Sequence, residues 1–304
     1  MADQSLRGVY APTLTPVQAD LTIDLPAYIE FCRRLLEGGC HGLVLFGTNS
    51  EATSFCAAER MAAVDAVIEA GIPADRLVIG TGAAAITEAV ALSRHAVQAG
   101  CRGVLTLPPF YYPNVSDEGL FRSFAAIIDG VNDERLRIYF YHIPQVSGVP
   151  LSPALLARLA EAYPRLAAGV KDSSGDVDTL LGLHSVARQS PGFAVFCGTE
   201  GLLLKNMQGG GGGCISGMAN VLPHVIRDLY DNWQAPDAEE RQDRTNWIRN
   251  AILDSGLNLI AALKVIVADQ TGRPGWSRVR PPLVDLTEEE QAQLLAKLSQ
   301  PVAA

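Results

Sequence analysis

The sequence has no long hydrophobic run, and its first residues carry no secretion signal. No apolar segment approaches the roughly 18 residues that a membrane-spanning helix needs. The opening stretch, MADQSLRGVY, contains an early aspartate and no apolar signal-peptide core. We therefore expect a cytoplasmic protein with no membrane partner.

Positive charge is also scarce. The chain has 24 Lys and Arg residues against 33 Asp and Glu residues, which gives a formal net charge of −9. Nucleic-acid binding requires a basic face that meets the phosphate backbone. This balance of charge therefore argues against a nucleic-acid partner.

Cysteine occurs without the spacing of a metal site or of a disulfide framework. The chain has no C-x-x-C pair, and its six cysteines are Cys32, Cys40, Cys56, Cys101, Cys197 and Cys214. Such scattered cysteines are typical of small buried hydrophobic residues in a reducing compartment. No clustered His, Asp and Glu triad is present either, so we expect no metal ion.

What the sequence does contain is a recurring short apolar segment that is rich in β-forming residues. The segments are GVYAPTLTP from Gly8, GLVLFGT from Gly42, RLVIGTG from Arg76, GVLTLPPF from Gly103, RIYFYHIP from Arg137, AAGVKDSS from Ala167, AVFCGT from Ala194 and GCISGMAN from Gly213. Segments with helical spacing, such as PALLARLAEAY, separate them. Apolar strands that alternate with amphipathic helices predict a parallel sheet covered by helices.

The number of these units indicates the fold class. Eight units over about 230 residues fit a closed (β/α)₈ barrel better than an open sheet. After Asn220 the pattern is helical, as in EERQDRTNWIRNAIL and NLIAALKVIVADQTG. We predict an α/β fold with a TIM barrel over residues 1–224. A C-terminal helical extension over residues 225–304 is expected to pack on the barrel as an appended bundle.

One predicted strand ends on a lysine. In AAGVKDSSGD, at 167–176, four small or apolar residues lead into Lys171 before the chain turns polar. Burial of an unpaired ammonium group costs several kcal/mol. Lys171 is therefore either a structural residue whose amine has reached solvent or a catalytic amine made nucleophilic by desolvation. Tyr141 ends the neighbouring strand, at the face where barrel enzymes place their chemistry, and a phenol beside an amine suits imine chemistry.

The residues at other strand ends can be explained either by substrate binding or by structural roles such as turns, helix caps and packing. Thr48 and Asn49 in FGTNSE offer donors suited to a carboxylate, but such residues also form common turns and helix N-caps. Tyr111 and Tyr112 in PPFYYP fit packing aromatics equally well. Alternation along the strand points His142 to the opposite side from Tyr141, which favours a structural role.

Three motifs in this order resemble the dihydrodipicolinate synthase/N-acetylneuraminate lyase family. They are GTNSE at 47–51, YHIPQVSG at 141–148 and GVKDSSG at 169–175, and the similarity extends over nearly the whole chain. The resemblance implies a class I aldolase in which Lys171 forms an imine with a 2-oxo acid. It implies no external cofactor and assigns proton transfer to Tyr141.

The resemblance also implies roles for residues outside this pair. Thr48 and Asn49 would hold the substrate carboxylate, although Asn49 departs from the two adjacent hydroxyl residues of many members. Tyr111, rather than Tyr112, would cross to the site of a neighbouring subunit. The expected assembly is a homotetramer built from two tight dimers.

One departure from the family pattern bears on the substrate. Val146 stands where the synthases of lysine biosynthesis have an arginine that grips a second carboxylate, and valine has no donor. This favours reversible aldol cleavage of a 2-oxo-3-deoxy sugar acid or a related 4-hydroxy-2-oxo acid, with release of pyruvate. Ser173, Glu200 and Ser216 would then face the distal hydroxyls, although each also fits a cap or turn.

Several alternatives stay open. A dehydratase or deaminase, or dihydrodipicolinate synthase itself, would use the same lysine imine. A phosphate-binding barrel would use the glycine run 209–213 as an anion cradle, but this run precedes the last strand and lacks a P-loop lysine. Tight backbone packing is the favoured interpretation of the run. The non-enzyme alternative is a ligand sensor that kept the fold.

Overall fold

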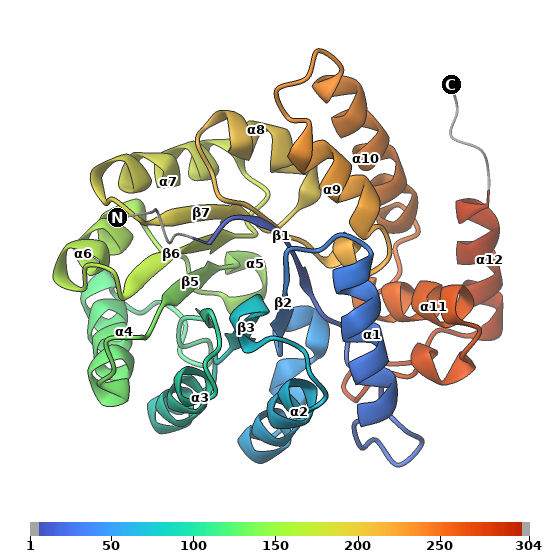
Figure 1. Cartoon of the computed structure of the whole chain (residues 1–304), viewed down its shortest axis with the longest axis horizontal. Coiled ribbons are helices and arrows are strands. Elements are labelled where there is room, and N and C mark those ends of the chain that lie inside the picture. Colours follow the sequence, from blue (N-terminus) through green and yellow to red (C-terminus); the bar gives the residue numbers. More distant parts are fainter. Residues whose placement is uncertain (1–5, 300–304) are drawn as a thin grey trace.

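The protein folds as a closed barrel of parallel strands. The computed structural model describes residues 6–299, apart from the side chain of Ile248. Within this range the strands pair in sequence order, and β8 pairs with β1 to close the barrel (Figure 1). The strands are β1 (Gly8–Pro12), β2 (Gly42–Leu45), β3 (Leu77–Gly80), β4 (Gly103–Thr106), β5 (Ile138–His142), β6 (Ala167–Asp172), β7 (Ala194–Cys197) and β8 (Gly213–Ile215). Each lies in one of the predicted segments, which confirms the (β/α)₈ TIM barrel.

Helices cover the outer face of the barrel (Figure 1). Those that follow successive strands are α1 (Leu25–Glu37), α2 (Ala57–Glu69), α3 (Ile86–Gln98), α4 (Asp117–Val131), α6 (Pro153–Ala162), α7 (Val177–Gln189), α8 (Leu203–Gln208) and α9 (Pro223–Asp231), and the short α5 (Pro144–Ser147) follows β5 directly. Ser116 and Asp176 cap α4 and α7 by accepting from backbone amides. Over residues 6–299, each helix is too short or too polar to cross a bilayer.

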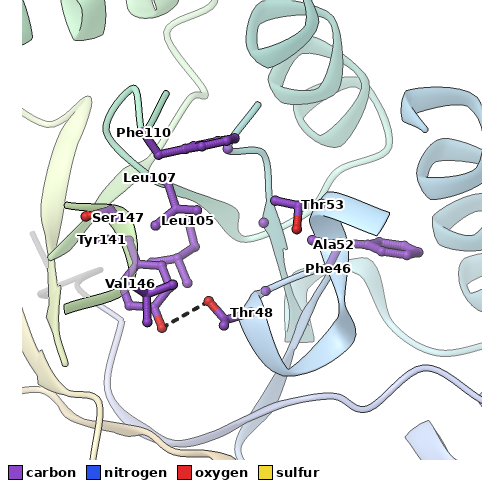
Figure 2. A pocket seen from close by; sticks show the side chains of 13 residues that line it. Phe46, Thr48, Ala52, Thr53, Leu105, Leu107, Phe110, Tyr141, Val146 and Ser147 are labelled. Atoms are coloured by element: carbon purple, nitrogen blue, oxygen red, sulfur yellow. Dashed lines mark hydrogen bonds between the residues drawn. The ribbon is translucent and has the colours of Figure 1, made fainter. Parts of the chain in front are cut away.

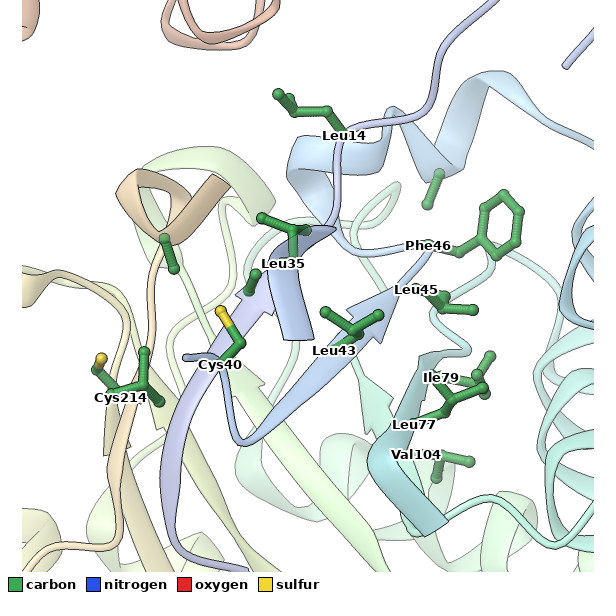
Figure 3. Packing of buried hydrophobic residues seen from close by; sticks show 14 of the residues in the cluster. Leu14, Leu35, Cys40, Leu43, Leu45, Phe46, Leu77, Ile79, Val104 and Cys214 are labelled. Carbon is green, nitrogen blue, oxygen red and sulfur yellow. The ribbon is translucent and has the colours of Figure 1, made fainter. Parts of the chain in front are cut away.

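Alternation along the strands divides the core into two hydrophobic clusters. Leu43 and Leu45 of β2 face outward and join Leu35 of α1 in the larger cluster between barrel and helices (Figure 3). Val44, between them, belongs to the smaller cluster, which fills the barrel interior together with Phe196 of β7. The interior is therefore packed with side chains.

The glycine run before β8 packs against neighbouring backbone and side chains. Gly213 has a φ of 134°, and a Cβ atom there would lie 2.0 Å from the carbonyl oxygen of Gly8 on β1. At Gly211, a Cβ atom would lie 2.3 Å from the amide oxygen of Asn206. These contacts support the interpretation of the run as tight packing that lets β8 close the barrel.

The cysteines follow the sequence expectation only in part. All six are free, and Cys32, Cys40, Cys197 and Cys214 are buried. Burial raises the pKa of the Cys40 thiol to about 12. The expectation of burial is wrong for Cys56, because this residue is the exposed N-cap of α2, where its backbone amide donates to Glu59.

The last helices gather on one side of the barrel (Figure 1). They are α10 (Ala238–Leu253), α11 (Leu259–Thr271) and α12 (Glu288–Leu298). The 3₁₀ helices that follow β7 and β8, at 200–202 and 217–220, pack against α10 and α11 respectively. The predicted boundary between residues 224 and 225 falls inside α9, which packs on β1. The division of the chain into barrel and extension stays a prediction.

A buried ion pair ties α11 to the loop that follows β2. The Lys264 amine lies 2.5 Å from Oε1 of Glu51, and the two side chains are 0% and 1% exposed. Lys264 also donates to the carbonyl of Arg278 at 2.7 Å, and Glu51 accepts from the backbone amide of Arg280 at 2.6 Å. Glu51 sits at a φ of 57°, directly after the turn that carries Thr48. The ion pair therefore links this turn to α11, which lies more than 200 residues later in the sequence.

We predict that Lys264→Met destabilises the protein by roughly 3–5 kcal/mol, because the variant leaves the Glu51 carboxylate buried without its counter-ion. Urea unfolding followed by circular dichroism measures this loss. Lys205→Met removes an exposed lysine and serves as the control. Lys264→Met combined with Glu51→Gln should recover part of the stability. A single variant that unfolds at the wild-type urea concentration would contradict the prediction.

Candidate active site

A cavity of about 350 Å³ opens at the carboxyl ends of the strands. In a parallel barrel these ends meet at one mouth, so side chains that are distant in the sequence converge there. The predicted site residues that line the cavity are Thr48, Asn49, Tyr141, Lys171, Ser173, Glu200 and Ser216. Seven of the eight predicted site residues thus share one cavity, and Tyr111 is the exception.

Lys171 and Tyr141 are neighbours because β5 and β6 pair in register. The two residues are direct partners in the parallel ladder, and both side chains point into the mouth. The Lys171 amine lies 4.2 Å from the centre of the Tyr141 ring. Both residues are at most 4% exposed. The structure therefore places a buried amine over the face of a phenol, as expected for an acid–base partner.

Tyr141 sits in a polar setting that favours loss of its proton. Burial raises its pKa, but Lys171 and the hydrogen bonds from Thr48, Ser173 and Lys171 outweigh burial and lower the pKa below the ordinary value. Thr48 donates to the phenol oxygen at 3.4 Å, and Figure 2 shows this contact. The phenol is therefore linked to the turn after β2 as well as to the amine.

The turn after β2 presents donors to the same cavity. Thr48 and Asn49 lie in a 3₁₀ helix at 48–50, which the buried Ser50 anchors by donating to the carbonyl of Thr13. The amide nitrogen Nδ2 of Asn49 is buried against Gly217 and has no hydrogen-bond partner among the described residues. A buried amide without a partner is costly, so this donor is suited to an acceptor that the cavity receives.

The opposite wall of the cavity is formed after β7 and β8. Ser216 donates to Oε2 of Glu200, and Arg249 of α10 places Nε 3.3 Å from Oε1 of the same carboxylate. Burial raises the pKa of Glu200, whereas the hydrogen bond from Ser216 and the charge of Arg249 oppose this shift. Ser173 lines the cavity between this wall and Tyr141.

A second, mostly apolar cavity of about 270 Å³ adjoins the first. Leu105, Leu107 and Phe110 line it, and Figure 2 shows these side chains facing Thr48 across the space. Tyr141 and Val146 line both cavities. Val146 is 65% exposed, so its side chain is open to the mouth.

Tyr111 lies outside both cavities in this chain. Its side chain is 75% exposed, and its ring packs edge-on against Tyr112 with 5.2 Å between the ring centres. The structure of one subunit therefore does not bring Tyr111 to Lys171, and its predicted role in a neighbouring site stays a prediction.

Arg249 is a cavity residue that the sequence analysis missed. It belongs to TNWIRN in α10, where charged residues occur without a motif that marks one of them. His142 was expected to point away from the site. It lines neither cavity and is buried with Nδ1 3.2 Å from Oδ1 of Asp172.

Within residues 6–299, no group of His, Cys, Asp and Glu side chains is placed to hold a metal ion.

Comparisons with known proteins agree with the fold. The profile of the dihydrodipicolinate synthetase family matches residues 5–301. An uncharacterized DapA-like lyase of Chloroflexus aurantiacus is 32% identical over 95% of this chain and 95% of its own. The crystal structure of dihydrodipicolinate synthase from Agrobacterium tumefaciens, 36% identical, covers 95% of this chain and 97% of its own with a TM-score of 0.87.

A third relative was crystallised with a ligand. The structure of YagE, a prophage protein from Escherichia coli K12, was determined in complex with pyruvate. It is 30% identical, covers 96% of this chain and 97% of its own, and superimposes with a TM-score of 0.87. The name of YagE describes it provisionally as a 2-dehydro-3-deoxy-D-gluconate aldolase. With a family profile that spans the chain and relatives that match it over nearly their whole length, this protein belongs to the dihydrodipicolinate synthetase family.

Proposed function

We propose that this lyase catalyses reversible aldol cleavage of a 2-oxo-3-deoxy sugar acid, or of a related 4-hydroxy-2-oxo acid, and releases pyruvate. The observation that carries the proposal is the buried Lys171 amine 4.2 Å above the Tyr141 ring, at the mouth of the barrel. Aldolases of this family form a lysine Schiff base with the substrate and use no external cofactor. The pyruvate complex and the provisional name of YagE support the same chemistry.

The first steps form an imine. The unprotonated Lys171 amine attacks C2 of the 2-oxo acid to form a carbinolamine. Tyr141 protonates the departing hydroxyl, which leaves as water, and this gives a protonated imine and the Tyr141 phenolate. Thr48 and Asn49 hold the substrate carboxylate with a hydroxyl and an amide donor from the turn after β2. The unpaired Nδ2 of Asn49 supports this assignment, because a bound carboxylate would satisfy it.

Cleavage then uses the imine as an electron sink. Tyr141 as phenolate takes the proton of the C4 hydroxyl, the C3–C4 bond breaks, and its electron pair moves through the enamine to the imine nitrogen. The aldehyde leaves, and Tyr141 delivers its proton to C3. Water then hydrolyses the protonated imine to pyruvate and the free amine, and the released proton returns to Tyr141. The lowered pKa of Tyr141 supports its role as the base in this step.

The distal part of the substrate would meet the wall formed after β7 and β8. Ser173, Glu200 and Ser216 line the cavity there, and they offer both donors and acceptors to hydroxyl groups. Val146 adds no donor at the mouth. We therefore assign the activity to the sugar-acid branch of the family in preference to dihydrodipicolinate synthesis.

We also propose that the active form is a homotetramer in which Tyr111 completes the site of a neighbouring subunit. The exposed Tyr111 ring supports this, because a large aromatic side chain at 75% exposure is available to a partner. The apolar cavity beside Tyr141 would receive the partner's ring. Light scattering measures the molar mass of the protein in solution and so the number of subunits. An active monomer at assay concentration would contradict the proposal.

The test of the mechanism is covalent trapping. Pyruvate with borohydride should add one pyruvyl group to Lys171, and none to Lys205, Lys264 or Lys297, because reduction fixes the imine on the nucleophilic amine. Intact mass and peptide mapping measure the adduct. Lys171→Met serves as the control and should take no label. An unmodified Lys171, under conditions that label a known family member fully, would refute the mechanism and favour a ligand sensor.

Tyr141→Phe should fold normally and turn over more slowly by roughly 10²–10⁴-fold, the range expected for loss of a general acid–base group. The loss of one hydroxyl leaves the ring packing intact, so thermal unfolding should resemble that of the wild type. Steady-state kinetics of pyruvate release measure the effect. Turnover near the wild-type rate would show that another group moves the proton.

The choice of branch predicts that dihydrodipicolinate synthesis from pyruvate and aspartate semialdehyde is a weak activity. Val146 makes no charge-assisted contact with a second carboxylate. The kcat/KM for dihydrodipicolinate synthesis should therefore be about ten- to a hundredfold lower than in a protein with arginine at this position. Val146→Arg should therefore raise this activity. Val284→Arg adds the same charge at an exposed site outside both cavities and serves as the control. Synthesis by the wild type that matches its best aldol cleavage would overturn the assignment.

A further inference from the structure

Arg249 is the cationic side chain that α10 contributes to the cavity wall. It lines the cavity together with Lys171 and is 32% exposed, whereas the side chain of its neighbour Glu200 is only 3% exposed. A ligand that reaches this wall therefore meets the guanidinium before it meets the carboxylate.

The contacts of Arg249 fix its position without using all of its donors. Its Nε lies 3.3 Å from Oε1 of Glu200, and one terminal nitrogen donates to the side chain of Asn250 at 3.1 Å. The other terminal nitrogen has no hydrogen-bond partner among residues 6–299. Because guanidinium geometry is planar, this held side chain keeps a donor in a defined direction.

The Glu200 carboxylate is buried behind Arg249, and its Oε1 has no hydrogen-bond partner among the described residues. Its Oε2 accepts from Ser216, its Oε1 faces Arg249, and its backbone carbonyl accepts from Gln242 at 3.0 Å. Glu200 is thus the buried counter-ion of Arg249, and the pair as a whole carries no net charge when Glu200 is ionised.

This charge balance distinguishes two kinds of substrate. A substrate hydroxyl group can accept a hydrogen bond from the remaining Arg249 donor. Because the hydroxyl carries no charge, it leaves the charge balance between Arg249 and Glu200 unchanged. A second carboxylate would place two anions beside one guanidinium, and such like-charge juxtaposition is unfavourable. An arginine without a counter-ion would instead attract the carboxylate.

We propose that Arg249 is a specificity-determining residue for the distal end of the substrate, and that its pairing with Glu200 selects a hydroxylated end over a second carboxylate. The inference rests on the proposed aldol cleavage and narrows its substrate class. In this selection Glu200 acts through Arg249 as its counter-ion, in addition to its proposed contact with the substrate hydroxyls.

The test compares two substrates of equal carbon number, a 2-oxo-3-deoxyaldonate that ends in a hydroxymethyl group and the matching 2-oxo-3-deoxyaldarate that ends in a carboxylate. Arg249→Met should raise KM for the aldonate by about ten- to a hundredfold, because a charge-assisted hydrogen bond is lost. Its kcat should change less, because the proposal places Arg249 at the far end of the substrate, away from the reacting carbons. Arg244→Met, an exposed position on the same helix, is the matched control and should behave as the wild type.

A second variant tests the charge balance itself. Glu200→Gln keeps the size of the side chain and a hydrogen bond to Ser216 but removes the counter-charge. It should raise the ratio of aldarate to aldonate kcat/KM by about tenfold or more, because one of the two opposing anions is gone. Arg249→Lys keeps the charge but lacks the planar guanidinium, so its KM for the aldonate should fall between those of the wild type and Arg249→Met.

Trapping of pyruvate on Lys171 separates failure of this inference from failure of the proposed function. Pyruvate has no distal end, so all four variants should label as the wild type does. A wild type that prefers the aldarate, an Arg249→Met variant with wild-type KM, or an unchanged ratio in Glu200→Gln would each overturn the inference. A wild-type protein that takes no label would refute the proposed function instead.

Discussion

The candidate site depends on the register between β5 and β6. The parallel ladder sets Tyr141 against Lys171 and, one step later, His142 against Asp172. Alternation sends the first pair into the mouth of the barrel and leaves the second pair buried outside both cavities, where His142 lies 3.2 Å from Asp172. A slip of one residue would exchange these environments and remove the amine from the cavity. The register is thus a condition of the chemistry as well as of the fold.

The cavity draws its two ends from different parts of the chain. Strand ends of the barrel supply the end where we propose that the reaction takes place, with Lys171, Tyr141 and the turn that carries Thr48. The far wall adds Arg249 from α10, a helix that lies beyond the last strand. A barrel enzyme of this kind can keep its bond-breaking groups unchanged while the segments around the mouth alter the choice of substrate.

The strands and most of the site could be predicted from the sequence because both follow local rules. Each strand is an apolar run, and the residues that end a parallel strand must gather at one face, which places Lys171 and Tyr141 together. Their proposed roles came from the family resemblance. The position of Arg249 could not be predicted, because only the packing of α10 on the turn after β7 decides which of its arginines reaches the cavity. The exposure of Cys56 was missed because the prediction treated every cysteine as a buried hydrophobic residue. Cys56 is the N-cap of α2.

The ion pair between Glu51 and Lys264 has a consequence for how the protein is made. Chains emerge from the ribosome with the N-terminus first, and domains begin to fold during synthesis. All eight strands of the barrel are therefore synthesised before Lys264, the partner of Glu51, which lies on α11. Until then the turn with Thr48 and Asn49 has the hydrogen bond from Ser50 to Thr13 but lacks the ion pair with α11. The turn to which we assign carboxylate binding therefore gains its contact with Lys264 only after every strand of the barrel has been synthesised.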